Sequence, residues 1–362
     1  MWDFINITVE DRPVLLAALI AALIQPDVPH PVLALFAEQG SAKSTTTRML
    51  VDLIDPSPVA LRQPPRDADS WVTAASGSWV VALDNLSAIP PWLSDSLCRA
   101  ATGDGNVKRA LYTDADLAVV KFRRCVIING IDVGAVRPDL AERMAMVDLR
   151  RIERHMRQPE ATMRQLWRTA LPGILAGLLN LAATVHHRLE TTVVDYAPRM
   201  ADFGRVLACV DGVLSSDGLR RYASRSDQLS EDSLSGNPFV EQLRHRVREP
   251  LRSQSGTDLL TLVTPTGDHL HRPKDWPRNG REVTSLLRRH APALRRLGWA
   301  IEDDAARNHR NVLLWTIYPP SEDVAAQRAS QPSLLRPSPT ASPPLERPSV
   351  RPDDECRDDI ST

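Results

Sequence analysis

Residues 31–45 read PVLALFAEQGSAKST, and this stretch decides the fold of the 362-residue chain. The apolar run Pro31–Phe36 predicts a buried strand, and the small residues after it predict a tight turn into a helix. Such a turn points backbone N–H groups at an anion, while a lysine reaches the outer phosphates and a hydroxyl ligates Mg²⁺. Lys43 and Ser44 stand at the positions of that lysine and that hydroxyl. The stretch therefore predicts a strand, a loop and a helix that bind ATP with Mg²⁺.

The loop departs from the pattern GxxxxGK[ST] at both of its glycine positions, where Ala37 and Ala42 stand. A methyl group at either position can crowd the backbone or disfavour the positive φ that glycine adopts freely. The alternative interpretation is a helix start of small residues with an exposed lysine. If the loop does bind phosphates, the residues that form it are Glu38, Gln39, Gly40, Ser41, Ala42, Lys43, Ser44 and Thr45.

A second apolar run, SWVVALDN at residues 78–85, ends in an acid as a buried parallel strand would. The Asp84 carboxylate can hold the water shell of Mg²⁺, and Asn85 can orient an attacking water. Ser44 and Asp84 are therefore the predicted metal-site residues. The alternative is a core strand that ends in a plain turn.

A third run, CVIING at residues 125–130, also ends in a polar amide. Ligands gather at the carboxyl ends of parallel strands, so Lys43, Asp84 and Asn129 are expected to converge there. Asn129 would then be placed to sense the γ-phosphate. The pair Asn129-Gly130 is equally compatible with a plain turn.

Taken together, these segments resemble the AAA+ type ATPases, and within them the superfamily 3 phage and plasmid helicases and the related bacterial mobile-element "ATP-binding proteins". The resemblance covers about residues 1–320. Relatives of this kind usually have Gly where Ala37 stands, and this departure bears more on turnover than on nucleotide binding. The most specific segments are EQGSAKST (38–45), LDNLSAIPPWLSDSLCRAATGDG (83–105), KRALYTD (108–114), IINGID (127–132), RPDLAER (137–143) and PRMADF (198–203).

The resemblance implies an α/β fold of the P-loop NTPase type, AAA+ like, with a parallel sheet and a helical lid. It places the ATPase core at residues 31–152 and the lid at residues 153–230. Residues 1–30 are predicted to supply a short strand over Met1–Thr8 and a helix over Asp11–Ile24, both packed on the core.

The same resemblance assigns a role to each residue of the site. Lys43, Ser44 and Thr45 would hold the phosphates and Mg²⁺. Asp84 would hold a metal-bound water, and Asn129 would be the sensor.

Three arginines complete the implied catalytic set. Arg143 resembles the finger that a neighbouring subunit's ATP would meet, and Arg137 is the competing candidate. A guanidinium inserted in this way stabilises charge on the transferring phosphoryl oxygens. Arg199, expected to open a helix after Pro198, would contact the γ-phosphate from the lid. The alternative for Arg143 is an ordinary surface ion pair with a nearby acid of its own chain, such as Asp139.

Residues 102–114 are rich in turn-forming residues and then basic, and they resemble the hairpin that superfamily 3 helicases point into their central channel. Lys108 and Arg109 would there hold a nucleic-acid backbone without reading its sequence. Two basic residues on a solvated hairpin are the alternative.

Apolar residues recur at helical spacing in the expected lid, which predicts packing against the core. The longest apolar stretch, Leu171–Val185, is shorter than the roughly 20 residues that span a bilayer. Pro172 and Asn180 also interrupt it, so no membrane helix is expected. The residues at helical spacing are Leu166, Trp167, Leu171, Ile174, Leu175, Leu178 and Leu179.

Residues 237–318 predict a small α+β domain of the winged-helix-like type, since helices are followed by a short hairpin. Residues 244–310 hold 14 Lys plus Arg against 8 Asp plus Glu, so the domain is basic and could meet DNA phosphates. A solvated face on an ordinary helix explains the charge as well. Residues 319–362 are rich in Pro and Ser and are expected to be disordered.

Composition narrows the remaining possibilities. The net charge is −1, and the four cysteines are scattered without a CxxC pair, so neither a zinc ribbon nor a disulfide framework is indicated. His269 and His271 lack partners at metal spacing and suggest a surface strand. No charged and then apolar leader opens the sequence, which predicts a cytoplasmic protein.

The function predicted from the sequence is an ATP-hydrolysing, helicase-like protein of a mobile element that works on DNA as a homo-oligomeric ring or filament. One alternative is a nucleotide-gated DNA-binding or assembly protein with little hydrolysis, which the alanines of the loop favour. A P-loop phosphotransferase acting on a small molecule is the other. The basic C-terminal domain and the two arginines that would act in trans argue against it.

Overall fold

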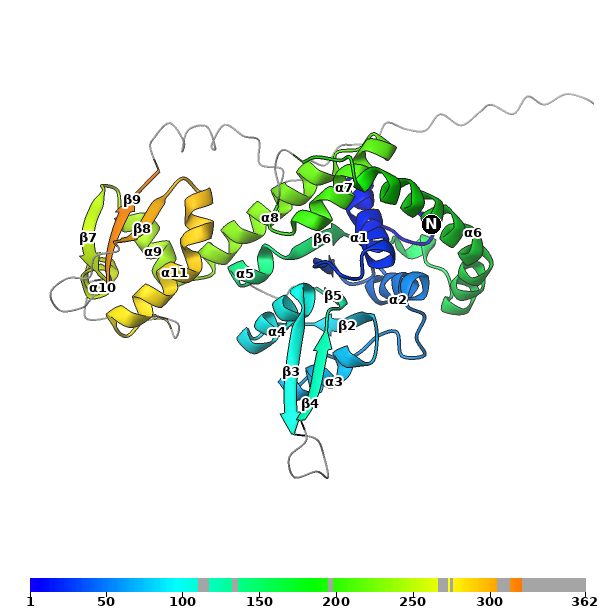
Figure 1. Ribbon diagram of the computed structural model, residues 1–362, viewed down its shortest axis with the longest axis horizontal. Coiled ribbons are helices and arrows are strands. Elements are labelled where there is room, and N and C mark those ends of the chain that lie inside the picture. Colours follow the sequence, from blue (N-terminus) through cyan, green and yellow to red (C-terminus); the bar gives the residue numbers. More distant parts are fainter. Residues whose placement is uncertain are drawn as a thin grey trace, which may run out of the picture. The chain divides into compact units, whose positions relative to one another are not determined.

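A four-stranded parallel sheet forms the centre of the chain (Figure 1). Its order is β2 (Val80–Leu86), β5 (Cys125–Gly130), β1 (Val32–Phe36) and β6 (Met144–Asp148). The three strands predicted from apolar runs are confirmed, and β6 joins them on the far side of β1. The computed structural model describes residues 1–109, 117–131, 136–194, 198–265, 273, 276–304 and 313–320, and only the backbone of the described residues within 104–122.

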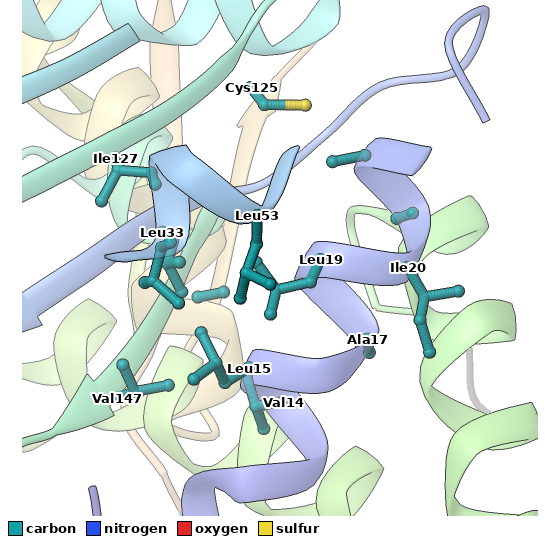
Figure 2. Close-up of a cluster of buried hydrophobic side chains, with 14 of the residues drawn as sticks. Val14, Leu15, Ala17, Leu19, Ile20, Leu33, Leu53, Cys125, Ile127 and Val147 are labelled. Atoms are coloured by element: carbon teal, nitrogen blue, oxygen red, sulfur yellow. The ribbon is translucent and has the colours of Figure 1, made fainter. Parts of the chain in front are cut away.

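Successive side chains of a strand point to opposite faces, so the continuous apolar runs fill two cores. Leu33 and Leu35 of β1 join one buried cluster, and Val32 and Ala34 join the other. The first cluster also takes in α1 (Arg12–Ile24) and α2 (Lys43–Ile54), whose leucines meet the strands in Figure 2. The second takes in α3 (Ala68–Ser76), α4 (Pro91–Thr102) and α5 (Pro138–Ala141).

The start of the chain differs from the sequence prediction. The helix expected over Asp11–Ile24 is confirmed as α1, preceded by a 3₁₀ turn, η1 (Val9–Asp11). The strand expected over Met1–Thr8 is wrong, because Phe4 and Ile5 donate their backbone N–H groups to Met1 O and close a turn. The segment pairs with the end of β6 only locally, through the isolated bridge of Ile7 with Leu149 and the hydrogen bond from Thr8 N–H to Asp148 O at 3.2 Å, among the described residues. The apolar side chains pack as a compact turn rather than extending the sheet.

Three helices form the segment predicted as a lid: α6 (Glu160–Leu189), α7 (Ala201–Leu214) and α8 (Gly218–Ser235). As predicted, Trp167 and Leu178 are buried in the first cluster. Leu166 and Leu179 are instead 47% and 48% exposed, because α6 contacts α1 and α7 along one narrow stripe. The helix expected to open at Arg199 begins two residues later, at Ala201.

The long helix α6 also corrects the expectation of an interrupted apolar stretch. Pro172 lies inside the helix without ending it, so the helix continues for 30 residues. By length and composition alone it could cross a membrane, and 17% of its most apolar window is buried. The buried residues that attach it to the first cluster are Trp167, Leu178, Ala182, Val185 and Leu189.

A hairpin begins where the sequence predicts one, but its second strand lies beyond the predicted residues 102–114. Strands β3 (Asp104–Arg109) and β4 (Leu117–Phe122) pair antiparallel, from Asp104 opposite Phe122 to Arg109 opposite Leu117. Lys108 and Arg109 therefore lie at the end of β3 that leads to the tip. The tip itself, residues 110–116, lies outside the described residues.

The C-terminal part folds as an α+β arrangement with its own core. Three helices and a strand, α9 (Pro238–Arg246), β7 (Leu251–Ser255), α10 (Gly256–Val263) and α11 (Gly280–Arg296), precede the hairpin of β8 (Ala300–Asp304) and β9 (Leu314–Tyr318). The antiparallel sheet has the order β7-β9-β8. Phe239, Leu287 and Trp315 lie in the buried cluster of this part, to which α11 contributes its apolar face. Residues 1–320 form one compact unit. His269, His271 and the tail after Pro320 lie outside the described residues.

Candidate functional site

The loop between β1 and α2 adopts the left-handed conformations that a concave row of amides needs. Gly40 has φ +83°, and Ala42, the N-cap of α2, has φ +60°. Ser41 is buried and donates its hydroxyl to Glu38 O at 2.9 Å, which holds the loop closed. No side chain caps α2, so its first N–H groups are left for another acceptor. A helix start of this kind binds anions.

Lys43 is the first residue of α2, and its side chain folds back over the loop that precedes the helix. Its Nζ donates to Ala37 O at 2.7 Å and to Glu38 O at 2.9 Å. Burial lowers the pKa of this ammonium, and the negative charge of Asp84 opposes that shift without cancelling it. The lysine is therefore held over the loop by two carbonyl groups, close enough to Asp84 to feel its charge.

Asp84 at the end of β2 meets the start of α2. Ser44 Oγ donates to Asp84 Oδ1 at 2.8 Å, which confirms that the two predicted metal-site side chains lie together. Oxygen ligands of this kind suit Mg²⁺, usually with several waters retained. Among the described residues no group of three or more His, Cys, Asp or Glu gathers as a metal cluster.

Asn85 and Asn129 are joined directly. The backbone N–H of Asn85 donates to Asn129 Oδ1 at 2.9 Å, and Asn129 Nδ2 donates to Thr47 Oγ1 of α2 at 3.0 Å. Asn85 has φ +59°, a conformation that asparagine tolerates better than most residues. Gly130 has to be glycine, because a Cβ there would lie 2.3 Å from Leu86 O. Hydrogen bonds thus join the carboxyl ends of β2 and β5 to the start of α2, as the sequence predicted.

The two alanines of the loop differ in their backbone strain, which gives the first testable prediction. The left-handed φ of Ala42 lowers the stability of the fold, because its Cβ is crowded in this conformation. Ala37 has no positive φ and donates its N–H to Gly130 O at 3.3 Å. Ala42→Gly should therefore raise the free energy of unfolding by about 1 kcal/mol. The matched control Ala37→Gly should lower it by about 0.5–1 kcal/mol. Urea unfolding followed by circular dichroism measures both, and a loss of stability in Ala42→Gly would contradict the loop geometry.

The three candidate arginines lie away from the loop, in ion pairs of their own chain. Arg143 pairs with Asp139, as the alternative interpretation of the sequence had it, and its side chain is only 12% exposed. Arg199 contacts Asp139 Oδ1 at 3.4 Å and Glu142 Oε2 at 3.2 Å. Burial raises the pKa of Asp139, but the hydrogen bond and charge of Arg143 outweigh it and leave the pKa below its usual value.

Arg137 has different partners: its Nη1 donates to Asp95 Oδ1 at 2.7 Å and to Pro91 O at 3.1 Å. The structure thus brings Arg143 and Arg199 together and leaves Arg137 apart from them. Glu142, buried beside this pair, also accepts a hydrogen bond from Arg296 of α11. The arginine cluster is therefore linked to the C-terminal part of the chain.

Other arginines near the loop were missed in the sequence. Arg48 and Arg62 line an open pocket together with Asp84 and Asn85. Arg62 donates to Ala74 O and Ser78 Oγ, which marks it as a structural residue. Arg157 lies against Gly40, with its Nη2 2.5 Å from where a Cβ on that residue would be. The run RRIERHMR at 150–157 was the signal that could have drawn attention to this segment.

Comparison with known families gives two matches, one after the other along the chain. Residues 1–232 match the family model described as actinomycete integrative conjugative element replication protein, and residues 245–332 match the model of the AICE RepA C-terminal domain. No curated protein matches the chain.

Two solved structures illustrate how distant the structural similarities are. A JCV helicase with a bound acetamide compound is 12% identical, with a TM-score of 0.29 over 62% of this chain and 67% of that one. The apo C-terminal region of NrS-1 is 13% identical, with a TM-score of 0.32 over 86% of this chain and 76% of that one. TM-scores of this size do not establish a shared fold, so the site is assigned from its own geometry.

Proposed function

Because the chain belongs to the actinomycete integrative conjugative element replication proteins, we propose that it binds and hydrolyses ATP while acting on the element's DNA. One observation carries this proposal. Lys43, Ser44 and Asp84 meet at the uncapped N-terminus of α2, at the carboxyl edge of a parallel sheet. This combination suits a triphosphate with its metal ion better than any other ligand class.

The residues of the loop fit the nucleotide and Mg²⁺ in their donor chemistry. The backbone N–H groups around Gly40 and at the start of α2 would donate to the phosphate oxygens, and the Lys43 ammonium would turn from the loop carbonyls to the outer phosphate oxygens. Ser44 Oγ and, through water, Asp84 would hold Mg²⁺, which neutralises charge on the phosphates. Asn85 would orient the attacking water, and the Asn129 amide would relay the state of the γ-phosphate to α2. In this proposal the protein has a P-loop NTPase fold of the AAA+ type.

The action on DNA is proposed for two surfaces. Lys108 and Arg109 would hold a phosphate backbone at the β3–β4 hairpin. The order of elements from α9 to β9 corresponds to a winged helix, and its basic charge suits DNA phosphates. Assembly as a ring or filament would bring Arg143 and Arg199 to the neighbour's ATP, in exchange for their present partners Asp139 and Glu142.

A second candidate function is nucleotide-gated assembly on DNA with little hydrolysis. Asp84 is followed by Asn85, whose amide cannot accept a proton as a second carboxylate would. The absence of a carboxylate at position 85 favours slow ATP hydrolysis. A small-molecule phosphotransferase has no comparable observation in its favour.

Phosphate release, measured with and without single-stranded DNA, distinguishes these functions. We expect steady release from Mg²⁺-ATP that rises at least about tenfold when the DNA is added, because assembly brings the arginines to the site. An Asp84→Asn variant serves as the control and should release no phosphate above background. ATP-dependent assembly without release in the wild-type chain would reject hydrolysis and leave the second candidate.

A further inference from the structure

The segment after β6 crosses over the loop between β1 and α2. The N–H of Ile152 donates to Gly40 O at 3.1 Å, and Arg151 Nη1 lies 4.0 Å from Glu38 Oε2. The 3₁₀ turn η2 (Arg154–Met156) follows, and α6 begins at Glu160. A hollow on this segment is lined mainly by basic side chains, those of Arg151, Arg154, His155 and Arg157 together with Ile152 and Glu153.

Arg157 is the member of this segment that rests on the loop. Its Nη2 would be 2.5 Å from a Cβ on Gly40, so the guanidinium occupies the space next to this residue and a side chain at position 40 would displace it. The positive φ of Gly40 is the feature that favours glycine there.

The Arg157 guanidinium is also free to take a ligand. In the part of the chain that the structure describes, no acid or hydroxyl pairs with it, whereas Arg137, Arg143 and Arg199 all have acidic partners. The Lys43 ammonium already donates hydrogen bonds to two carbonyl groups of the loop. Arg157 is therefore the unpaired cation that already lies against the loop.

We propose that Arg157 is a phosphate-binding residue of this site, supplied by the same chain that supplies Lys43. This inference rests on the proposed nucleotide site and adds to it a residue that neither the loop pattern nor the resemblance assigns. A guanidinium presents five N–H donors in a fixed fork that matches phosphate oxygens. With ATP bound, these donors would add to the N–H groups of the loop on the terminal phosphates.

Calorimetric titration with Mg²⁺-ATP tests the inference on the full chain. Arg157→Ala should weaken ATP binding at least about tenfold, since a hydrogen bond to a charged group is lost. Arg157→Lys keeps the charge without the fork and should fall between wild type and Arg157→Ala. The matched control is Arg154→Ala, which removes a charge of the same hollow that does not rest on Gly40, and it should bind within about twofold of wild type. Thermal unfolding of each variant checks that the exposed substitutions leave the fold intact.

The outcomes separate this inference from the proposed function. If Lys43→Ala loses ATP binding while Arg157→Ala binds as wild type does, the inference is wrong and the proposed site stands. An equal loss in Arg154→Ala and Arg157→Ala would show diffuse attraction by the basic segment and would also overturn the specific contact. If Lys43→Ala binds ATP normally, the loop is not the site, and both proposals fall.

Discussion

Replacing Lys43 by alanine is expected to abolish measurable ATP binding, with a loss of affinity of at least about 100-fold. The ammonium lies over the loop, held at 2.7 Å and 2.9 Å by the carbonyl groups of Ala37 and Glu38, from where it can turn to the outer phosphates. Charge-assisted hydrogen bonds to phosphate oxygens are among the strong ones, and two of them account for a loss of this size. Calorimetric titration with Mg²⁺-ATP measures the affinity directly.

The control for this variant removes one positive charge elsewhere. Arg220 on α8 is 83% exposed, and Arg220→Ala should bind ATP as the wild-type chain does. The unfolding temperature of Lys43→Ala should also be compared with wild type, because the two loop carbonyls lose their partner. Unchanged ATP affinity in a folded Lys43→Ala variant would reject the site assignment.

The second large effect is expected at Arg143. Arg143→Ala should reduce the rate of ATP hydrolysis by the assembled protein by about 10³-fold or more, since a guanidinium that acts on a neighbour's nucleotide contributes this much. ATP affinity should change little by comparison, because the residue acts on the transition state. Phosphate release from saturating Mg²⁺-ATP in the presence of single-stranded DNA is the measurement.

Mixing two inactive variants tests directly whether Arg143 acts on the ATP of a neighbouring subunit. A mixed assembly of Lys43→Ala and Arg143→Ala chains contains interfaces in which an intact Lys43 meets an intact Arg143, so part of the activity should return. Arg137→Ala is the matched comparison, since Arg137 is paired with Asp95 and lies apart from the cluster. Wild-type turnover in Arg143→Ala together with a large loss in Arg137→Ala would transfer the role to Arg137. Because Arg143 pairs with Asp139, the stability of Arg143→Ala should be measured alongside.

The sheet could be predicted because its strands are buried on both faces and therefore apolar throughout. Val32–Phe36 and Cys125–Gly130 stand out for this reason, and the polar residues Asp84 of β2 and Asn129 of β5 mark the edge where ligands gather. β6 has only four apolar residues, at 144–147, between the charged residues Arg143 and Asp148, so it did not stand out. The start of the chain was mispredicted because a short apolar run is equally able to form a packed turn.

The side-chain partners could not be predicted, because they depend on contacts between distant parts of the sequence. Arg157 lies 117 residues after Gly40 (157 − 40), and no local pattern links the two. Arg199 and Arg296 meet Glu142 for the same reason, through the folding of three separate segments. The convergence of Ser44 and Asp84 was predictable only because parallel strands share an edge. General chemistry thus pointed to the candidate site, and the structure was needed to find what surrounds it.

Titration of the wild-type chain with ATP, with and without Mg²⁺, is the measurement that tests the account most directly. The account predicts saturable binding of one ATP per chain, and at least about tenfold weaker binding when Mg²⁺ is removed, since Ser44 and Asp84 then lack the ion that links them to the phosphates. No detectable binding of ATP by the folded chain, or binding that is indifferent to Mg²⁺, would contradict it.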